Sequence, residues 1–364
     1  MGDCVACHTA KHAGAAKFAG GYPLHAGLGT VYSSNITPDR ETGIGTWTAD
    51  QFHRAMNSGI AADGHHLYPA FPYAYFTQLD RADTDAIFAY LKTVKPVHYR
   101  PPHNQLIFPA NIRAGMIAWN LLFLDQKPFH RDSSKSAEWN RGAELVKGIA
   151  HCGGCHTPKN FLFADKSGDT LDGYTADGWF APNLSGNAPD GLGNWSTGDI
   201  VQFLKTGRNS HSWVAGAMRP VIVDSTSRMK DADLHAIAVY LKSLPKRPQQ
   251  TPDAPDKAQM ARGQTIFVNR CAVCHEGDTK DYPSLAKNTL VQSRNPTTVL
   301  RIILRGATAT GNNGGGYSMP AFPVLSNKDL AAVATYIRNS WGNKAQPVTA
   351  QDVKSLRKEL KSMQ

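Results

Sequence analysis

One five-residue string occurs three times in this sequence, and it contains the residue types that can bind a metal or form covalent bonds. In each copy two cysteines are separated by two residues, and a histidine directly follows the second cysteine. This spacing is the attachment signature of c-type haem, in which two thioether bonds fix the porphyrin and the histidine binds its iron. The copies are Cys4-Val5-Ala6-Cys7-His8, Cys152-Gly153-Gly154-Cys155-His156 and Cys271-Ala272-Val273-Cys274-His275.

The sequence therefore predicts three covalently bound haem c groups, one for each string. We expect the cysteines to carry the porphyrins, and His8, His156 and His275 to be the proximal iron ligands. A structural zinc site needs four protein ligands, and a redox dithiol needs no histidine beside it. Since the three strings contain all six cysteines of the chain, none is left to complete a zinc cage or to form a disulfide.

Length and charge limit the class of protein. The 364 residues suit about three domains of ordinary size. Six haem propionates would reduce the formal net charge of +10 to about +4. The lysines and arginines are scattered from Lys11 to Lys361 rather than gathered in a basic stripe, so we expect no nucleic-acid partner. A modestly basic surface suits anionic phospholipid or an acidic redox partner.

No run of eighteen apolar residues is present, so the sequence predicts no transmembrane helix. The most apolar stretch outside the haem strings is 108–124, which Asn111, Arg113 and Asn120 interrupt. We interpret this stretch as a helix that packs between domains. An interfacial membrane segment is the alternative.

The first two haem strings begin two copies of one domain plan, since Cys4 and Cys152 are 148 positions apart and this offset recurs downstream. A closing amphipathic helix follows in each copy and again after the third string. Tyr90, Tyr240 and Tyr336 mark one position on that helix. The offset relates Asn35-Ile36-Thr37 to Asn183-Leu184-Ser185, Gly43-Ile44-Gly45 to Gly191-Leu192-Gly193, and Trp47 and Gly59 to Trp195 and Gly207.

A helix is also predicted before the second and third strings, in 136–150 and 256–270. Only Met1-Gly2-Asp3 stand before the first string. We therefore expect a helix of about fifteen residues, and an export signal, to precede the given sequence.

Proline-rich polar segments at 94–105 and 244–257 resist helix formation and would hold neighbouring modules at a set separation. They mark the predicted boundaries. We predict a first haem domain at 1–100, a linker with the apolar segment at 101–135, a second haem domain at 136–246, a linker at 247–258, a third haem domain at 259–345 and a tail at 346–364.

Two methionines stand where a sixth iron ligand is expected. Met218 and Met319 lie in loops between a haem string and the final helix, 22 and 17 residues before Tyr240 and Tyr336. Methionine is more often a core residue, but this position favours both as distal ligands. Histidine–methionine ligation raises the potential relative to two histidines.

The first module has Phe71 at the equivalent position, 19 residues before Tyr90, and phenylalanine cannot bind iron. We favour Met56, on the preceding helix, as the distal ligand of the first haem. His65 or His66, at the start of the loop, is the alternative, and an open five-coordinate haem is the third possibility.

With these motifs the chain resembles the three-haem cytochrome c subunits of bacterial membrane-bound, periplasm-facing dehydrogenases that oxidise alcohols, sugars, sugar acids or aldehydes. The resemblance covers nearly the whole length. It implies a mostly α fold with three tandem class I cytochrome c domains joined by proline-rich linkers. The segments that carry it are SNITPDRETGIGTWT, LYPAFPY, SAEWNRGAELVKGIAHCGGCHTP and the terminal MPAF.

The resemblance also implies a role, in which a catalytic partner oxidises the substrate and electrons pass singly through three haems to ubiquinone at the periplasmic face of the inner membrane. YPAFPY, GWFAPNLSG and VYLKSLP are most similar to subunits paired with a molybdopterin aldehyde or nicotinate dehydrogenase and its iron–sulfur subunit. A pyrroloquinoline quinone alcohol dehydrogenase or a flavin sugar dehydrogenase is the alternative partner. The sequence has no dinucleotide fingerprint, phosphate loop or hydrolytic triad of its own.

Two alternative functions, a haem peroxidase and a free electron shuttle, explain fewer of the motifs described above. A haem peroxidase would use an open first haem, with His65 or His66 as its distal base. A free electron shuttle would need neither three modules nor the apolar stretch at 108–124.

Overall fold

The computed structural model describes residues 1–176, 178–276, 282–308 and 318–362, and the described chain is mostly helical. The predicted mostly α class is therefore confirmed. Parts of the predicted third domain, including the glycines before Met319, and the last two residues of the tail lie outside the described residues. The chain divides into two compact units, one of residues 1–154 with 160–164 and one of residues 155–159 with 165–364.

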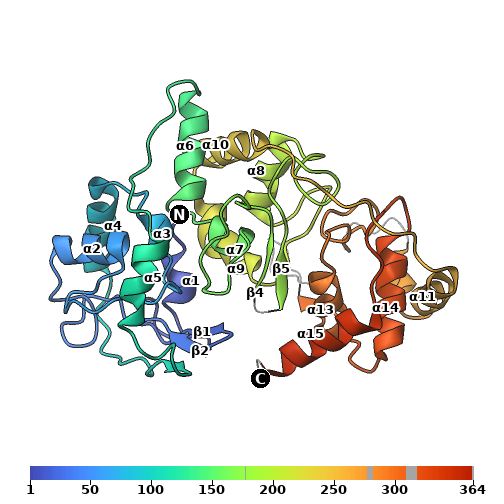
Figure 1. Ribbon diagram of the computed structural model, residues 1–364, viewed down its shortest axis with the longest axis horizontal. Coiled ribbons are helices and arrows are strands. Elements are labelled where there is room, and N and C mark those ends of the chain that lie inside the picture. Colours follow the sequence, from blue (N-terminus) through green and yellow to red (C-terminus); the bar gives the residue numbers. More distant parts are fainter. Residues whose placement is uncertain (177, 277–281, 309–317, 363–364) are drawn as a thin grey trace. The chain divides into compact units, whose positions relative to one another are not determined.

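The first unit contains the first haem string and a small antiparallel sheet of order β1-β2-β3. Along the chain the hairpin of β1 and β2 follows the haem string and precedes the first long helix, α2. Figure 1 draws these elements in blue. The elements of this unit are α1 (Cys4–Cys7), β1 (Pro23–Ala26), β2 (Gly29–Tyr32), α2 (Ala49–Ser58), α3 (Tyr73–Phe76), α4 (Arg81–Thr93), β3 (Gln105–Leu106), α5 (Gly115–Phe123) and α6 (Ala137–Lys147).

The second unit contains the third haem string and most of the second module. The second string lies at the division, with Cys152 in the first unit and Cys155 and His156 in the second. The predicted domain boundaries stay a prediction. The elements that follow α6 are α7 (Gly153–His156), β4 (Tyr174–Ala176), β5 (Trp179–Ala181), α8 (Thr197–Thr206), α9 (Met218–Pro220), a π-helix (Val221–Ser225), a 3-10 turn (Thr226–Arg228), α10 (Asp231–Lys242), α11 (Lys257–Arg270), α12 (Ala272–His275), α13 (Thr297–Arg305), β6 (Ala307–Thr308), β7 (Ser318–Met319), α14 (Asn327–Arg338) and α15 (Ala350–Ser362).

Capping residues mark the ends of the helices α2 and α8. Thr48 and Ser196 each form a capping box at the start of α2 and α8, which satisfies backbone N–H groups of the first turn. Gly59 and Gly207 end these two helices in the left-handed conformation that glycine adopts without strain. The matching caps show that the 148-residue repeat is a repeat of structure.

The predicted closing helices and the helices before the second and third strings are confirmed as α4, α10, α14, α6 and α11. The stretch 108–124 forms a shorter helix than its composition predicts, since α5 covers only Gly115–Phe123. Among the described residues no helix is both long enough and apolar enough to span a membrane.

A cation near the end of each closing helix fastens the loop that lies over it. Lys92 donates from Nζ to the carbonyl of Gly45 at 2.6 Å, and Lys242 donates to the carbonyl of Leu192 at 3.0 Å. In the third module Arg338 donates from Nη1 to the carbonyl of Val291 at 2.9 Å, and its side chain is completely buried. The three modules thus share one attachment between helix and loop.

The core of the third module is centred on the crossing of α11 and α14 (Figure 1). Gly263 of α11 lies directly against α14. A β-carbon at Gly263 would overlap the carbonyl oxygen of Ala332 and lie 2.7 Å from Cβ of Tyr336. The close approach of these helices therefore requires glycine.

We expect Gly263→Ala to destabilise the third module by about 1–3 kcal/mol or more, because neither helix backbone can move away without loosening the core. Thermal unfolding of the haem-loaded chain measures this loss as a lower melting temperature. Gly115→Ala is the matched control, since Gly115 begins a helix and its β-carbon would meet nothing within 4 Å. Equal melting temperatures for the two variants would contradict the account of the crossing.

Candidate functional site

Each haem string folds into a single helical turn. In the first string the N–H of His8 donates to the carbonyl of Cys4 at 2.8 Å, and in the third the N–H of His275 donates to that of Cys271 at 3.0 Å. Residues three and four apart in such a turn lie on one side of it. All six cysteines are free thiols. Two sulfurs and an imidazole are thus available on each turn, as covalent haem attachment requires.

The first two proximal histidines are held in the orientation that an iron ligand needs. Nδ1 of His8 lies 2.7 Å from the carbonyl oxygen of Ser34, and Nδ1 of His156 lies 2.7 Å from that of Pro182. A proton on Nδ1 that is donated to a carbonyl leaves the lone pair on Nε2 for a metal. Burial lowers the pKa of both imidazoles, and the carbonyl raises it in part, so the neutral form is favoured. These residues fit a haem iron.

The third histidine lies near a different backbone carbonyl and makes no hydrogen bond to it through Nδ1. Burial lowers the pKa of His275, and the backbone carbonyl of Pro283 raises it in part. Among the described residues Nδ1 of His275 has no hydrogen-bond partner, and its ring lies 6.4 Å from that of Tyr282. Pro283 follows His275 by eight residues, whereas the other two acceptors follow their histidines by 26. The third module thus has a carbonyl near its histidine, from a shorter loop, without the hydrogen bond that the first two modules make.

The carbonyl acceptors are functional residues that the sequence analysis missed. Ser34 and Pro182 directly precede the repeated Asn-Ile-Thr and Asn-Leu-Ser triplets. The side chain of Asn35 accepts from the N–H of Thr37 at 2.9 Å, and that of Asn183 accepts from the N–H of Ser185 at 2.7 Å. These turns fix the carbonyls in front of the histidines. The repeated triplets were the signal that could have located the acceptors.

In the first two modules the loop that precedes the closing helix, here called the distal loop, makes the same hydrogen bond to the end of the helix before it. Leu67 donates to the carbonyl of Gly59 at 2.7 Å, and Val214 donates to that of Gly207 at 2.7 Å. Phe71 follows Leu67 by four residues, just as Met218 follows Val214. Phe71 therefore has the structural position of Met218 and not only a similar distance from the closing helix.

The two predicted distal methionines lie in the expected loops. Met218 begins α9. Met319 lies in β7, pairs with Ala307 just after the end of α13, and packs half-buried against the core of the third module. The structure thus places Met218 and Met319 between their haem strings and closing helices. Their bonds to iron stay a prediction.

Met56 lies inside the core of the first module. It is 4% exposed and packs in one cluster with Phe52, Phe76 and Leu91. It is the eighth residue after the N-cap of α2, and the same count from the caps of α8 and α13 reaches Leu204 and Leu304.

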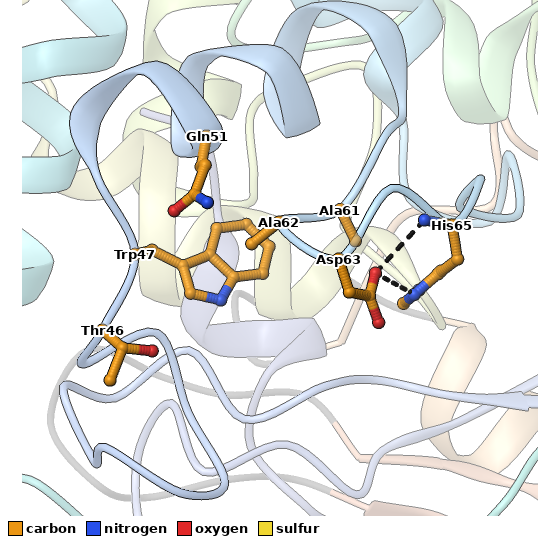
Figure 2. A pocket seen from close by; sticks show the side chains of 7 residues that line it. All are labelled: Thr46, Trp47, Gln51, Ala61, Ala62, Asp63 and His65. Atoms are coloured by element: carbon orange, nitrogen blue, oxygen red, sulfur yellow. Dashed lines mark hydrogen bonds and ion pairs between the residues drawn. The ribbon is translucent and has the colours of Figure 1, made fainter.

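The two candidate histidines have other partners. Nδ1 of His65 pairs with Asp63 at 2.6 Å, which lowers the pKa of that carboxyl, and His65 is partly exposed. Nδ1 of His66 accepts from the side-chain amide of Asn120 at 3.3 Å. Figure 2 shows His65 and Asp63 at a hollow of about 300 Å³. No haem-string residue contributes to its lining, which consists of Thr46, Trp47, Gln51, Ala61, Ala62, Asp63 and His65.

Inside the second unit, the β4–β5 hairpin of the second module is fastened to α13 of the third. Thr298 accepts from the N–H of Phe180 at 2.9 Å and donates to the carbonyl of the same residue at 3.1 Å. The guanidinium of Arg301 lies 4.4 Å from the ring centre of Trp179. These contacts satisfy polar backbone groups across the junction, so they hold the two modules in one fixed unit.

Comparison with known proteins also indicates three cytochrome c domains. A family model described as Cytochrome c matches residues 1–95, 140–245 and 260–341. The cytochrome c subunit of the quinone-type alcohol dehydrogenase of Komagataeibacter europaeus is 40% identical, over 98% of this chain and 82% of that protein. The fructose dehydrogenase cytochrome subunit of Gluconobacter japonicus is 37% identical, over 98% and 80%.

One of the subunits of the nicotinate dehydrogenase of Pseudomonas putida is also similar, with 40% identity over 93% of this chain and 29% of that protein. The three matched segments each contain one haem string. Histidine orientation, free thiols and family match thus agree with the predicted class. The chain belongs to the cytochrome c family, with three tandem cytochrome c domains and covalently bound haem c.

Proposed function

We propose that this chain is a three-haem electron-transfer subunit of a membrane-bound dehydrogenase. The observation that carries the proposal is the two-cysteine turn followed by a histidine in all three modules, with Nδ1 of the histidine 2.7 Å from a backbone carbonyl oxygen in the first two. Bound haem iron supplies one-electron exchange between its ferrous and ferric states. Relatives at 37–40% identity are named as cytochrome subunits of alcohol, fructose and gluconate dehydrogenases.

The chain's own residues orient the iron ligands and exclude water. The carbonyls of Ser34 and Pro182 hold the imidazole rings of His8 and His156 in one tautomer. In the third module the buried apolar cluster that includes Phe267 and Leu330 would keep water away from a haem held by the third string. Met218 and Met319 are proposed as the distal ligands of the second and third haems.

We propose a catalytic partner subunit that oxidises the substrate, since the sequence contains no dinucleotide fingerprint, phosphate loop or hydrolytic triad. A molybdopterin aldehyde dehydrogenase with a small iron–sulfur subunit is the partner that we favour, and ubiquinone is the proposed acceptor. The similarity to a nicotinate dehydrogenase subunit supports this choice. A quinone-type alcohol dehydrogenase or a flavin sugar dehydrogenase is the alternative, because relatives of those classes are equally or nearly as similar.

We also propose that the subunit works at the periplasmic face of the inner membrane and touches the lipid through α5. The outward side of α5 and its lead segment expose apolar residues, with Phe108 76% and Leu121 86% exposed. Residues 95–131 carry five lysines and arginines and one aspartate. An apolar face with a basic surrounding suits an anionic phospholipid surface.

Replacement of a distal methionine tests the ligand assignment. We expect Met218→Leu to convert one haem of three to the high-spin form, because leucine has no lone pair for iron. Electron paramagnetic resonance of the ferric protein measures this. Met229→Leu is the control, since Met229 is a buried core methionine. A low-spin second haem in Met218→Leu would contradict the assignment.

Purification of the chain from its native membrane tests the partner. We expect a larger subunit to purify with it and to contain molybdenum, and the complex to reduce a ubiquinone analogue when substrate is added. Metal analysis and a quinone reduction assay give both answers. A partner that contains pyrroloquinoline quinone or flavin would refute the molybdenum assignment, and the absence of any partner would refute the subunit role.

Vesicle binding tests the membrane contact. We expect the haem-loaded chain to bind vesicles of phosphatidylglycerol and phosphatidylcholine, and Leu121→Asp to weaken binding about tenfold or more, because a leucine side chain leaves the lipid. Val324→Asp is the matched control, since Val324 is 81% exposed and lies outside this segment. Equal binding of the two variants in a sedimentation assay would refute α5 as the contact.

A further inference from the structure

The first module has no ligating side chain at the position where the second module has its proposed distal ligand, Met218. The matched hydrogen bonds of Leu67 and Val214 assign Phe71 to the position of Met218. A phenyl ring has no lone pair for iron. We therefore looked for a distal methionine on the other described elements of the first unit.

The first unit has three methionines, and two of them are poor candidates. Met1 is half-exposed at the start of the chain. Met56 has the position on its helix that Leu204 and Leu304 have in the other two modules. Those two modules have a leucine at this position and a separate methionine in the distal loop. Its 4% exposure and its packing against Phe52 and Leu91 are those of a core side chain. Met116 of α5 remains.

The helix that carries Met116 is fastened to the distal loop of the first module. The hydroxyl of Tyr73, two residues after Phe71, donates to the side chain of Asn120 at 2.7 Å. The ring of Trp119 meets that of Tyr73 edge to face at 6.0 Å. Asn120 also donates to the carbonyl of Ser58 at 3.2 Å, at the end of α2. One face of α5 thus contacts residues before and after Phe71 in the chain, at the end of α2 and at Tyr73.

The segment that leads into α5 adds three further contacts to the same loop. Arg113 donates to the carbonyl of His66 at 2.9 Å, and its guanidinium lies 4.7 Å from the ring centre of Tyr68. The hydroxyl of Tyr68 donates to the carbonyl of Ala110 at 3.0 Å. The loop is therefore held against residues 110–120 along its length.

Met116 lies on the inward face of α5. Met116, Trp119, Asn120 and Phe123 follow the spacing of three, four and seven residues that defines one face of a helix. Met116 and Phe71 pack against the same cluster, which is formed by Tyr73, Trp119 and Ala164. Ile117 and Leu121 belong to the exposed face.

We propose that Met116 is the sixth ligand of the first haem, supplied by the connecting helix α5 in place of the loop residue Phe71. The proposal rests on the proposed function only in requiring a haem at the first string. A methionine on a packed helix can donate a thioether lone pair as a loop methionine does, and its side chain has enough rotatable bonds to adapt.

The test compares Met116→Leu and Met56→Leu in the full haem-loaded chain. We expect Met116→Leu to give one high-spin ferric haem of three, seen by electron paramagnetic resonance, and one ferrous haem that binds carbon monoxide. We expect Met56→Leu to retain three low-spin haems. Met116→His is the conservative variant, and it should restore a low-spin first haem with a lower potential, since histidine replaces methionine.

The results distinguish three causes of a changed spectrum: loss of the iron ligand, failure to fold, and failure of the proposed three-haem function. Three covalent haems in each variant show that the chain still folds and matures. A high-spin haem in Met56→Leu alone, three low-spin haems in Met116→Leu, or a first haem that is already high-spin in the unaltered chain would each overturn the proposal. Fewer than three haems in the unaltered chain would instead refute the three-haem function.

Discussion

The orientation of the proximal histidine by a backbone carbonyl is the constraint on which the first two modules depend. Nδ1 of His8 and of His156 lies 2.7 Å from its carbonyl, and this contact decides which ring nitrogen is left for iron. The carbonyl belongs to a loop, so the loop must be rigid. The side chains of Asn35 and Asn183 brace the turn, and a cation near the end of the closing helix fastens the part that follows. The haem string, the loop and the closing helix are therefore joined by hydrogen bonds and hold one another in place.

The sequence predicts the parts of this unit that depend on side-chain pattern. The haem strings, the closing helices that end near Lys92, Lys242 and Arg338, and the mostly α class all follow from spacing and amphipathic periodicity. The carbonyl acceptors do not, because any residue has a carbonyl and only the fold selects one. The short hairpins of 23–32 and 174–181 were also missed, since strands of three or four residues give almost no periodic signal. The length of α5 was overestimated because composition does not locate helix ends.

The first module shows how a repeat can diverge while its frame is kept. Its caps, its loop hydrogen bonds and its lysine contact match those of the second module, yet Phe71 stands where the second module has its proposed ligand, Met218. What distinguishes this module is α5, whose inward face is bonded to the distal loop and whose outward face is apolar and exposed. A linear comparison of the modules could not find this, because α5 lies outside the repeated segment and meets the loop only in the folded chain.

The central claim is that each of the three strings carries a covalently attached haem. The intact mass of the denatured chain, purified from cells that mature c-type cytochromes, tests this most directly, because only covalent groups survive denaturation. We predict a mass that exceeds the polypeptide by three haems, with the characteristic c-type spectrum after reduction in alkaline pyridine. A mass that corresponds to two haems or fewer, or to bound zinc without haem, would contradict the account.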